Sequence, residues 1–187
     1  MLGVVLAFFA FVAMRIDALG LRVQHTGSLP IGIYQVIGDA PPAQLLRRGA
    51  IGLWCLPVQS ARWAAERGYL HPGRCPSGVE PLAKVVLATS GDTVDFDARG
   101  VRLNGRMVLH TEPLSHDAAG RALTPAPYGR YKLRTNATWV WSPYSARSFD
   151  SRYLGPMPLG ALVAVVRPIW TINRKTLQHR SYPSSAR

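Results

Sequence analysis

Residues 82–88 read Leu-Ala-Lys-Val-Val-Leu-Ala, an apolar run whose length and β-branched content predict a buried β-strand. The run contains Lys84, and the chain has only two other lysines, Lys132 and Lys175, among its 22 lysine and arginine residues. Burial strips water from an ammonium ion and lowers its pKa, whereas arginine stays charged in proteins. We therefore expect Lys84 to be a neutral amine that can act as a general base. The alternative is an edge-strand lysine whose amine reaches solvent.

Further short strands surround this run and are separated by turn residues. The clearest is a hairpin over residues 101–109, in which Asn104-Gly105 joins two alternating segments. One short helix is predicted at residues 61–67, with Ser60 as its cap. Other strands are predicted at residues 32–37, 50–56, 93–96, 128–133, 138–141 and 161–166. This pattern predicts a mainly β domain with one short helix.

Residues 1–14 carry no charge and read as a membrane segment, although 14 residues of helix span about 21 Å and a bilayer core is about 30 Å thick. A signal-peptide core or a buried helix is the alternative. We expect an uncleaved transmembrane anchor over residues 1–21. The basic residues that usually precede such an anchor are missing, and Arg15 and Arg22 follow it, which favours a natural start upstream of Met1.

The net charge of +12 suits attraction to anionic lipid, and an arginine-rich solubilising composition explains it equally well. No RNA-binding signature or base-reading helix is present, so nucleic acid is not expected as a partner.

Cys55 and Cys75 lie 20 residues apart and fit an exported domain. We expect them to form a disulfide, with two unpaired buried thiols as the alternative. No cofactor is expected, and no metal site, because His71 and His110 lack a ligand-like spacing.

Thr26-Gly27-Ser28-Leu29-Pro30 follows the predicted anchor and is the best partner for a neutral lysine. Gly27 allows unusual backbone angles and Pro30 stiffens the exit, so Ser28 would lie on a tight, accessible turn. The backbone N–H of Ser28 and the hydroxyl of Thr26 could bind an oxyanion. Thr-Gly-Ser is also a common turn with no catalytic role.

Three motifs together resemble those of type I signal peptidases. They are Thr26 to Pro30, then Lys84 followed by Ser90-Gly91-Asp92-Thr93-Val94, then Ser148-Phe149-Asp150-Ser151-Arg152-Tyr153-Leu154-Gly155-Pro156. Their order and spacing also agree with that family. Gly-Ser-Leu-Pro-Ile-Gly-Ile-Tyr, from residue 27, is similar to the conjugative-transfer branch, the TraF-type pilin-maturing peptidases. The resemblance covers residues 24–168 and implies a signal-peptidase-like antiparallel β fold.

The resemblance also implies a role for each matching residue. Ser28 would be the nucleophile and Lys84 the general base, with Thr26 assisting the oxyanion hole. Ser148 would orient the lysine amine.

The remaining matches would support the site. Asp150 and Arg152 would brace it, and the likeness to the transfer branch implies a more direct role for Asp150. From the residues alone, a structural loop salt bridge is an equally good reading of Asp150. Gly91 and Asp92 would form a structural turn.

The resemblance predicts a membrane-anchored Ser-Lys endopeptidase that processes an exported precursor, such as a conjugative pilin, with either hydrolysis or cyclisation of the product. Its partners would be the membrane, the precursor and the conjugation machinery. It would lie in the bacterial inner membrane with residues 22–170 as a periplasmic catalytic domain, a small hairpin excursion at about 95–140, and a basic tail at 171–187.

Two other functions share parts of this pattern. A non-catalytic basic β scaffold tethered in a secretion or conjugation apparatus would need no neutral lysine. A self-cleaving repressor relative would share the serine and lysine but would carry a DNA-binding domain where this chain has residues 1–21.

Overall fold

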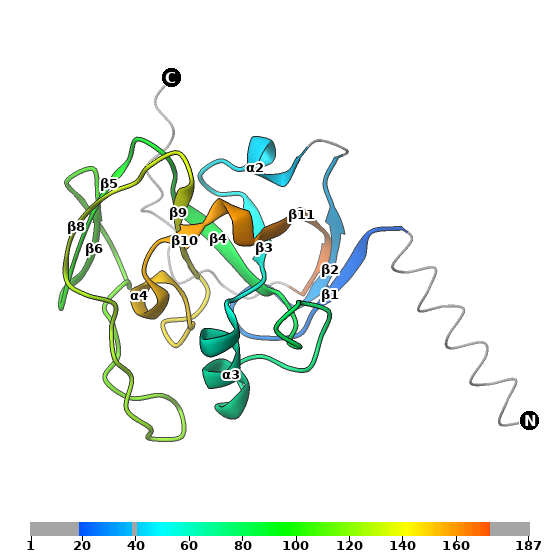
Figure 1. Ribbon diagram of the computed structural model, residues 1–187, viewed down its shortest axis with the longest axis horizontal. Helices are drawn as coiled ribbons and strands as arrows, with labels where there is room; N and C mark the ends of the chain where they lie inside the picture. The colour runs from blue at the N-terminus through cyan, green and yellow to red at the C-terminus, as the bar shows by residue number, and fades with distance from the viewer. Residues whose placement is uncertain (1–18, 39–40, 173–187) are drawn as a thin grey trace, which may run out of the picture.

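The structure is a computed structural model that describes residues 19–38 and 41–172 (Figure 1). Within these residues the strands form two antiparallel sheets. In spatial order the larger sheet comprises β1 Leu21–Gln24, β2 Gly32–Val36, β11 Leu162–Thr171, β3 Ile51–Trp54, β4 Leu82–Ala88, β9 Ala137–Trp141 and β10 Met157–Pro158. The smaller sheet comprises β7 Arg106–Val108, β6 Gly100–Leu103, β5 Thr93–Asp97 and β8 Gly129–Lys132. The predicted mainly β class is confirmed.

Short helices connect the strands. They are α2 Pro42–Leu45, α3 Val58–Glu66, α4 Ser151–Leu154 and the 3₁₀ helix η1 Leu159–Ala161. The longest, α3, begins three residues before the predicted start. Its N-cap is Pro57 rather than Ser60, because proline already has the φ of a helix entry and its missing N–H is not needed there. Gly68, with φ of +70°, follows the helix.

Strand β4 has the bounds predicted from its sequence and lies inside the larger sheet between β3 and β9. Val85 and Leu87 pack into the core cluster shared with the smaller sheet. Leu82 and Val86 point the other way, into a second cluster that includes α3. Both faces of β4 are therefore buried, which explains why its sequence is apolar throughout rather than alternating. Lys84 lies on the same face as Leu82 and Val86.

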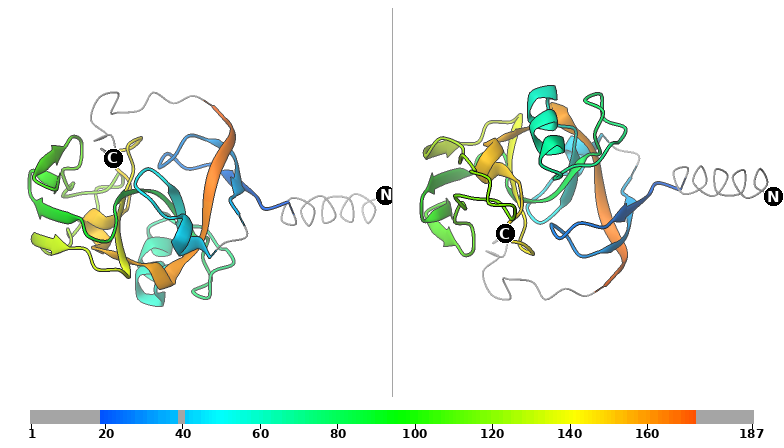
Figure 2. Two further views of the ribbon diagram at one scale, coloured as in Figure 1. Left: turned by 90° about the horizontal axis from the view of Figure 1, so that it is seen from above. Right: turned by 90° about the horizontal axis from the view of Figure 1, so that it is seen from below.

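Along the molecule's long axis, β5, β6 and β8 of the smaller sheet lie at one end, and β1 and β2 of the larger sheet lie toward the other (Figures 1 and 2). The segment predicted as a small hairpin excursion, about 95–140, contains this four-stranded sheet except for the first residues of β5. Residues 110–127 do not hang free from it. Tyr69 Oη donates to Asp117 Oδ2 at 2.6 Å, and Leu114 N donates to Tyr153 Oη at 2.9 Å.

Strand β11 continues through Pro168, where its sequence predicted an end. Residues 162–165 of the strand pair with β3, Val166 pairs with both β3 and β2, and beyond Val166 the strand pairs with β2 alone. A proline lacks the N–H that a second neighbour would require, so it is tolerated on this open side. The register shifts between Pro168 and Trp170, as expected for a proline in a strand.

No helix in the described part of the chain is long and apolar enough to cross a membrane. Residues 1–18 of the predicted anchor lie outside the described residues, as does the tail from residue 173. Leu21, the last residue of the predicted anchor, begins strand β1, which the sequence did not reveal.

We expect Gly52→Ala to destabilise the fold by about 1–3 kcal/mol, because it overpacks the core beside Lys84. Gly52 pairs with Lys84 across the β3–β4 ladder, and a Cβ there would lie 2.2 Å from the ring of Trp54. Trp54 is 0% exposed, so its ring is enclosed by other core residues. Urea unfolding midpoints would measure the loss. Gly160→Ala is the matched control, since nothing lies within 4 Å of its Cβ position. Equal midpoints for the two variants would contradict the prediction.

Candidate active site

The turn that carries Ser28 joins β1 to β2 and is fixed from three sides. Leu29 is 1% exposed and packs into the core. Tyr34 Oη donates to the carbonyl of Pro30 at 2.8 Å. Ser142 Oγ donates to the carbonyl of Ser28 itself at 2.7 Å. With its backbone held in this way, Ser28 presents its hydroxyl to the adjacent cavity.

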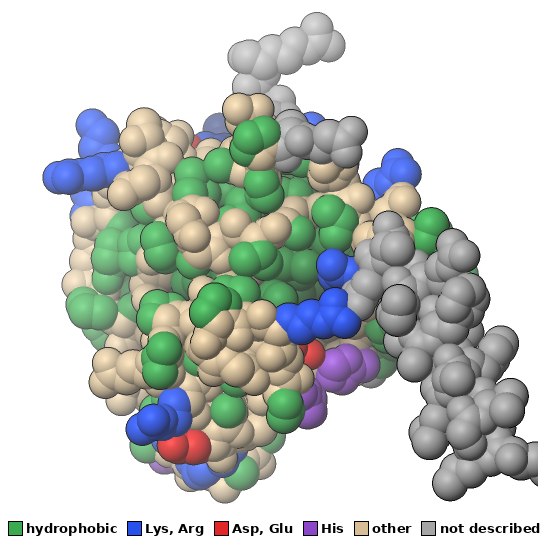
Figure 3. Space-filling view, turned by 45° about the vertical axis from the view of Figure 1, so that its right-hand side comes forward, with side chains coloured by type: hydrophobic (Ala, Val, Ile, Leu, Met, Phe, Trp, Pro, Cys, Tyr) green, Lys and Arg blue, Asp and Glu red, His purple; other side chains and the backbone are tan. Residues whose placement is uncertain are grey.

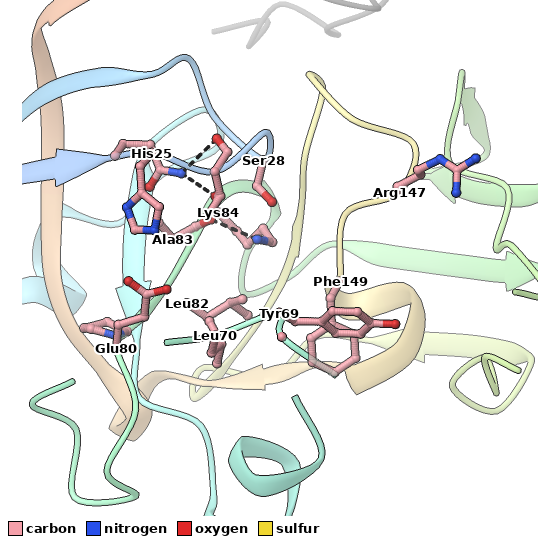
Figure 4. Close-up of a pocket in the computed structure, with 14 residues that line it drawn as sticks. His25, Ser28, Tyr69, Leu70, Glu80, Leu82, Ala83, Lys84, Arg147 and Phe149 are labelled. Carbon is pink, nitrogen blue, oxygen red and sulfur yellow. Dashed lines mark hydrogen bonds between the residues drawn. The ribbon is translucent and has the colours of Figure 1, made fainter. Parts of the chain in front are cut away.

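That cavity has a volume of about 220 Å³ and contains both predicted reacting groups in its lining. Its wall includes Thr26, Ser28, Leu70, Leu82, Lys84 and Phe149. Figure 4 shows Ser28 and Lys84 entering it from two different segments, with the hydroxyl and the amine facing each other. The predicted pair is therefore assembled at one place, although 56 residues separate the two positions in the sequence.

Lys84 is 3% exposed, and its Nζ donates to the carbonyl of Ala83 at 3.1 Å. Burial is the largest influence on this amine, and it lowers the pKa of Lys84 from 10.5 to about 8. The carboxylates of Asp150 and Glu80 act in the opposite direction, and Arg152 reinforces the lowering. No carboxylate hydrogen-bonds the amine among the described residues, so it can lose its proton near neutral pH.

Ser148 lies beside Ser28, and no hydrogen bond joins it to Lys84 among the described residues. Its Oγ is 3.5 Å from Ser28 Oγ, and the side chain is almost completely buried. The family resemblance implied that Ser148 orients the amine of Lys84. In this structure Ser148 lies within hydrogen-bonding distance of Ser28 instead, so the contact would orient the Ser28 hydroxyl.

Thr26 is held by a residue that sequence analysis missed. Gln24 Nε2 donates to Thr26 Oγ1 at 2.6 Å and to the Thr26 carbonyl at 3.2 Å. Because Oγ1 accepts this bond, its own proton remains available for donation toward the cavity. Gln24 belongs to β1, and no motif in the sequence marked it. Ser142 was also missed, because its contact is with the carbonyl of Ser28, 114 residues earlier in the sequence.

Asp150 and Arg152 form a buried ion pair behind the cavity. Arg152 donates from Nε to Asp150 Oδ1 and from Nη2 to Oδ2, each at 2.9 Å. Asp150 also caps α4 by accepting from Arg152 N at 3.2 Å. The other guanidinium protons reach the carbonyls of Glu112, Ala146 and Ser148. This geometry matches the bracing role, because both carboxylate oxygens face Arg152 and Asp150 does not line the cavity.

Gly91 and Asp92 form a turn after β4, as the resemblance implied. Gly91 has a φ of +87°, which glycine adopts without strain. Burial would raise the pKa of Asp92, but hydrogen bonds from Arg48, Thr89 N and Asn104 outweigh it and lower that pKa. The ionised carboxylate thus ties Arg48 to the start of the smaller sheet.

Cys55 and Cys75 form a disulfide in the structure, as predicted. The bond links the end of β3 to the loop at residues 69–81 on one side of the cavity.

Within this loop, His71 and Glu80 lie beside His25. One ligand atom from each of the three residues, an imidazole nitrogen or a carboxylate oxygen, lies within 4.8 Å of the other two. These are the residues of the described chain that could hold a metal ion. Sequence analysis did not identify this group.

Comparisons with known proteins agree with the motifs. The family model described as "Signal peptidase, peptidase S26" matches residues 3–171. A plasmid transfer protein TraF of Escherichia coli is 36% identical over 172 residues, covering 90% of this chain and 94% of the relative. A probable conjugal transfer protein TraF of Sinorhizobium fredii is 33% identical over 153 residues, covering 81% of this chain and 78% of the relative.

Among solved structures, a signal peptidase I of Enterococcus faecalis is 17% identical with a TM-score of 0.34, covering 64% of this chain and 95% of that chain. This likeness is weak, and the sequence matches carry the assignment. They span most of the chain and include the turn of Ser28, the strand of Lys84 and the segment of Asp150. The chain belongs to the signal peptidase family, peptidase S26.

Proposed function

We propose that the chain is a serine endopeptidase in which Ser28 and Lys84 form the catalytic dyad. The observation that carries this proposal is a buried amine with a lowered pKa facing a serine hydroxyl across one cavity (Figure 4). A base must be largely deprotonated near its working pH, and Lys84 meets this condition better than any exposed lysine would.

In the first step Ser28 Oγ attacks the carbonyl carbon of the scissile bond, and its proton passes to the neutral Nζ of Lys84. The Ser28 N–H and the Thr26 hydroxyl donate to the oxyanion that forms. The intermediate collapses as the Lys84 ammonium gives its proton to the departing amine. This leaves an acyl group on Ser28 and Lys84 neutral again.

A second nucleophile then releases the acyl group. Lys84 takes a proton from the nucleophile as it attacks the ester carbonyl, and returns a proton to Ser28 Oγ as the ester bond breaks. If the nucleophile is water, the product has a free carboxylate. If it is the amino terminus of the peptide that is bound to Ser28, the product is a cyclic peptide. Both routes require the same residues of this chain.

We propose an exported precursor, such as a conjugative pilin, as the substrate. Relatives described as plasmid or conjugal transfer proteins support this choice. The apolar residues 1–14 and the Cys55–Cys75 disulfide support an inner-membrane anchor with the catalytic residues in the oxidising periplasm. A shared membrane would raise the local concentration of precursor around the enzyme.

Incubation of the full-length protein with candidate pilin precursors, followed by mass spectrometry of the products, tests this function. We expect a new terminus in the wild-type reaction and none with Ser28→Ala. A cyclic product would be lighter than the hydrolysed one by one water. Processing that persists with Ser28→Ala would overturn the dyad, whereas precursors left uncut by the wild type would favour the non-catalytic tethered scaffold.

We expect kcat/KM to rise with pH through about 8 and then level off, because the deprotonated form of Lys84 is the active one. Below that value the rate should fall about tenfold per pH unit, since one group must lose one proton. A fluorogenic peptide containing the cleavage site would give the profile. A rate that is constant from about pH 6 to 9 would contradict Lys84 as the base.

A further inference from the structure

His25, His71 and Glu80 converge beside the cavity from two segments that are far apart in the sequence. His25 follows β1 and lies three residues before Ser28, while His71 and Glu80 flank the loop that contains Cys75. His25 Nε2 is 3.4 Å from His71 Nδ1, and His71 Nδ1 is 3.0 Å from Glu80 Oε1. In Figure 4 the carboxylate of Glu80 points toward the ring of His25.

These separations suit a tetrahedral metal ion. Bonds of about 2.0–2.1 Å from zinc to nitrogen or oxygen place neighbouring ligand atoms about 3.3 Å apart in a tetrahedron. The two measured distances lie on either side of that value, and all three ligand atoms lie within 4.8 Å of one another. Two imidazoles and one carboxylate are also a donor set that zinc accepts, with a fourth position open to water.

Two of the ligands are held in place by the backbone between them. Glu80 N donates to the carbonyl of His71 at 2.8 Å, and His71 N donates to Glu80 Oε1 at 3.1 Å. Between them Pro72 and Val79 form an antiparallel bridge. The loop is further tied to the end of β3 by the Cys55–Cys75 disulfide. A metal ion would therefore meet ligands that are already close to their bound positions, which favours binding.

The cluster also borders the route to the nucleophile. His25 and Glu80 line the same cavity as Ser28 and Lys84. Histidine side chains are exposed on the molecular face shown in Figure 3, beside acidic and basic groups. An ion held there would join the turn of Ser28 to the disulfide loop and would lie against the wall of the cavity that His25 and Glu80 form.

We infer that His25, His71 and Glu80 form a binding site for a zinc-class divalent transition ion, and that its occupancy inhibits access to Ser28. The binding half is independent of the proposed peptidase function, and the inhibition half rests on it. Magnesium is not expected to bind, because it prefers all-oxygen, octahedral sites.

Titration calorimetry of the full-length protein in detergent with Zn²⁺ alone tests the binding half. We expect one zinc per chain, with affinity reduced at least about tenfold in His71→Ala and Glu80→Gln. His116→Ala is the control, since His116 is exposed and outside the cluster. Thermal unfolding without metal would show that each variant is folded. Equal zinc affinity in wild type and His71→Ala would overturn the site.

The inhibition half is measured with the precursor-cleavage assay, each variant being compared with its own rate without zinc. We expect zinc to inhibit the wild type and His116→Ala at the same concentration, and His71→Ala only at a concentration at least about tenfold higher. Zinc that binds one per chain without slowing cleavage would overturn inhibition but not binding. If the protein cleaves no precursor, the calorimetric result still decides whether the site exists.

Discussion

Lys84→Met is expected to lower kcat/KM for precursor cleavage by at least about 10³-fold while leaving the fold at least as stable as the wild type. Methionine has nearly the length of lysine and suits the buried face of β4, but it cannot accept the proton of Ser28. Lowering the pKa of Lys84 from 10.5 to about 8 corresponds to roughly 3 kcal/mol of destabilisation while the amine is protonated. Methionine removes that unfavourable contribution.

The stability half of this prediction has a definite pH dependence. The unfolded chain binds its lysine proton up to about pH 10.5, whereas the folded chain releases it at about 8. The contribution of Lys84 to the free energy of unfolding therefore rises between about pH 8 and pH 10.5, and it is lowest below about pH 8. The advantage of Lys84→Met over wild type should be largest at neutral pH and should vanish above about pH 10.5. Urea unfolding at several pH values would measure it.

Two further lysine variants separate charge from proton transfer. Lys84→Arg keeps a cation that cannot deprotonate, and it should be inactive. Lys132→Met removes an exposed lysine of β8 and should leave cleavage unchanged. Substantial cleavage by either Lys84 variant would show that another group accepts the proton from Ser28.

Arg152→Met is expected to destabilise the protein by about 3–5 kcal/mol, because it leaves the carboxylate of Asp150 buried without its partner. Asp150 is 0% exposed and Arg152 is 1% exposed, so water cannot replace the lost hydrogen bonds. The carbonyls of Glu112, Ala146 and Ser148 would also lose their donor. The free energy of unfolding from denaturant titration is the direct measurement.

A double-mutant cycle tests the electrostatic origin of that loss. Asp150→Asn combined with Arg152→Met leaves no unpaired charge and keeps an acceptor at the start of α4, so much of the stability should return. Arg130→Met is the surface control. Arg130 pairs with Asp95 on an exposed strand, with 74% of its side chain accessible, and little change is expected. If Arg152→Met and Arg130→Met have similar effects, the buried pair does not support the fold.

Arg152→Met should also change the pH dependence of cleavage, which a purely structural role of Arg152 would not do. Asp150 raises the pKa of Lys84 and Arg152 lowers it. Without Arg152 the carboxylate would hold the ammonium more strongly, and the midpoint of the pH–rate profile should move upward. A profile that keeps its midpoint would mean that the pair does not influence the base.

Local sequence patterns were sufficient for features that depend on neighbouring residues. The apolar run at Leu82–Ala88 has the predicted bounds, and the Asn104-Gly105 turn joins β6 to β7. Pro168 misled the prediction, because the absence of β3 beside that part of β11 makes a proline acceptable. The helix start at Val58, with Pro57 as the N-cap, was missed because Ser60 offered a more familiar cap. The first error therefore came from the arrangement of neighbouring strands, and the second came from a competing local preference for a helix cap.

For the candidate site, the sequence by itself determined which residue types carry the chemistry. An isolated lysine in a buried strand and a serine on a rigid turn were recognisable, because burial and turn geometry follow from short-range patterns. Tertiary structure alone decided what surrounds them. Ser142 holds the Ser28 carbonyl across 114 residues, and His25 meets His71 across 46. Such contacts depend on the register of strands and the path of loops, and the side chains of one segment do not encode where a distant segment will lie.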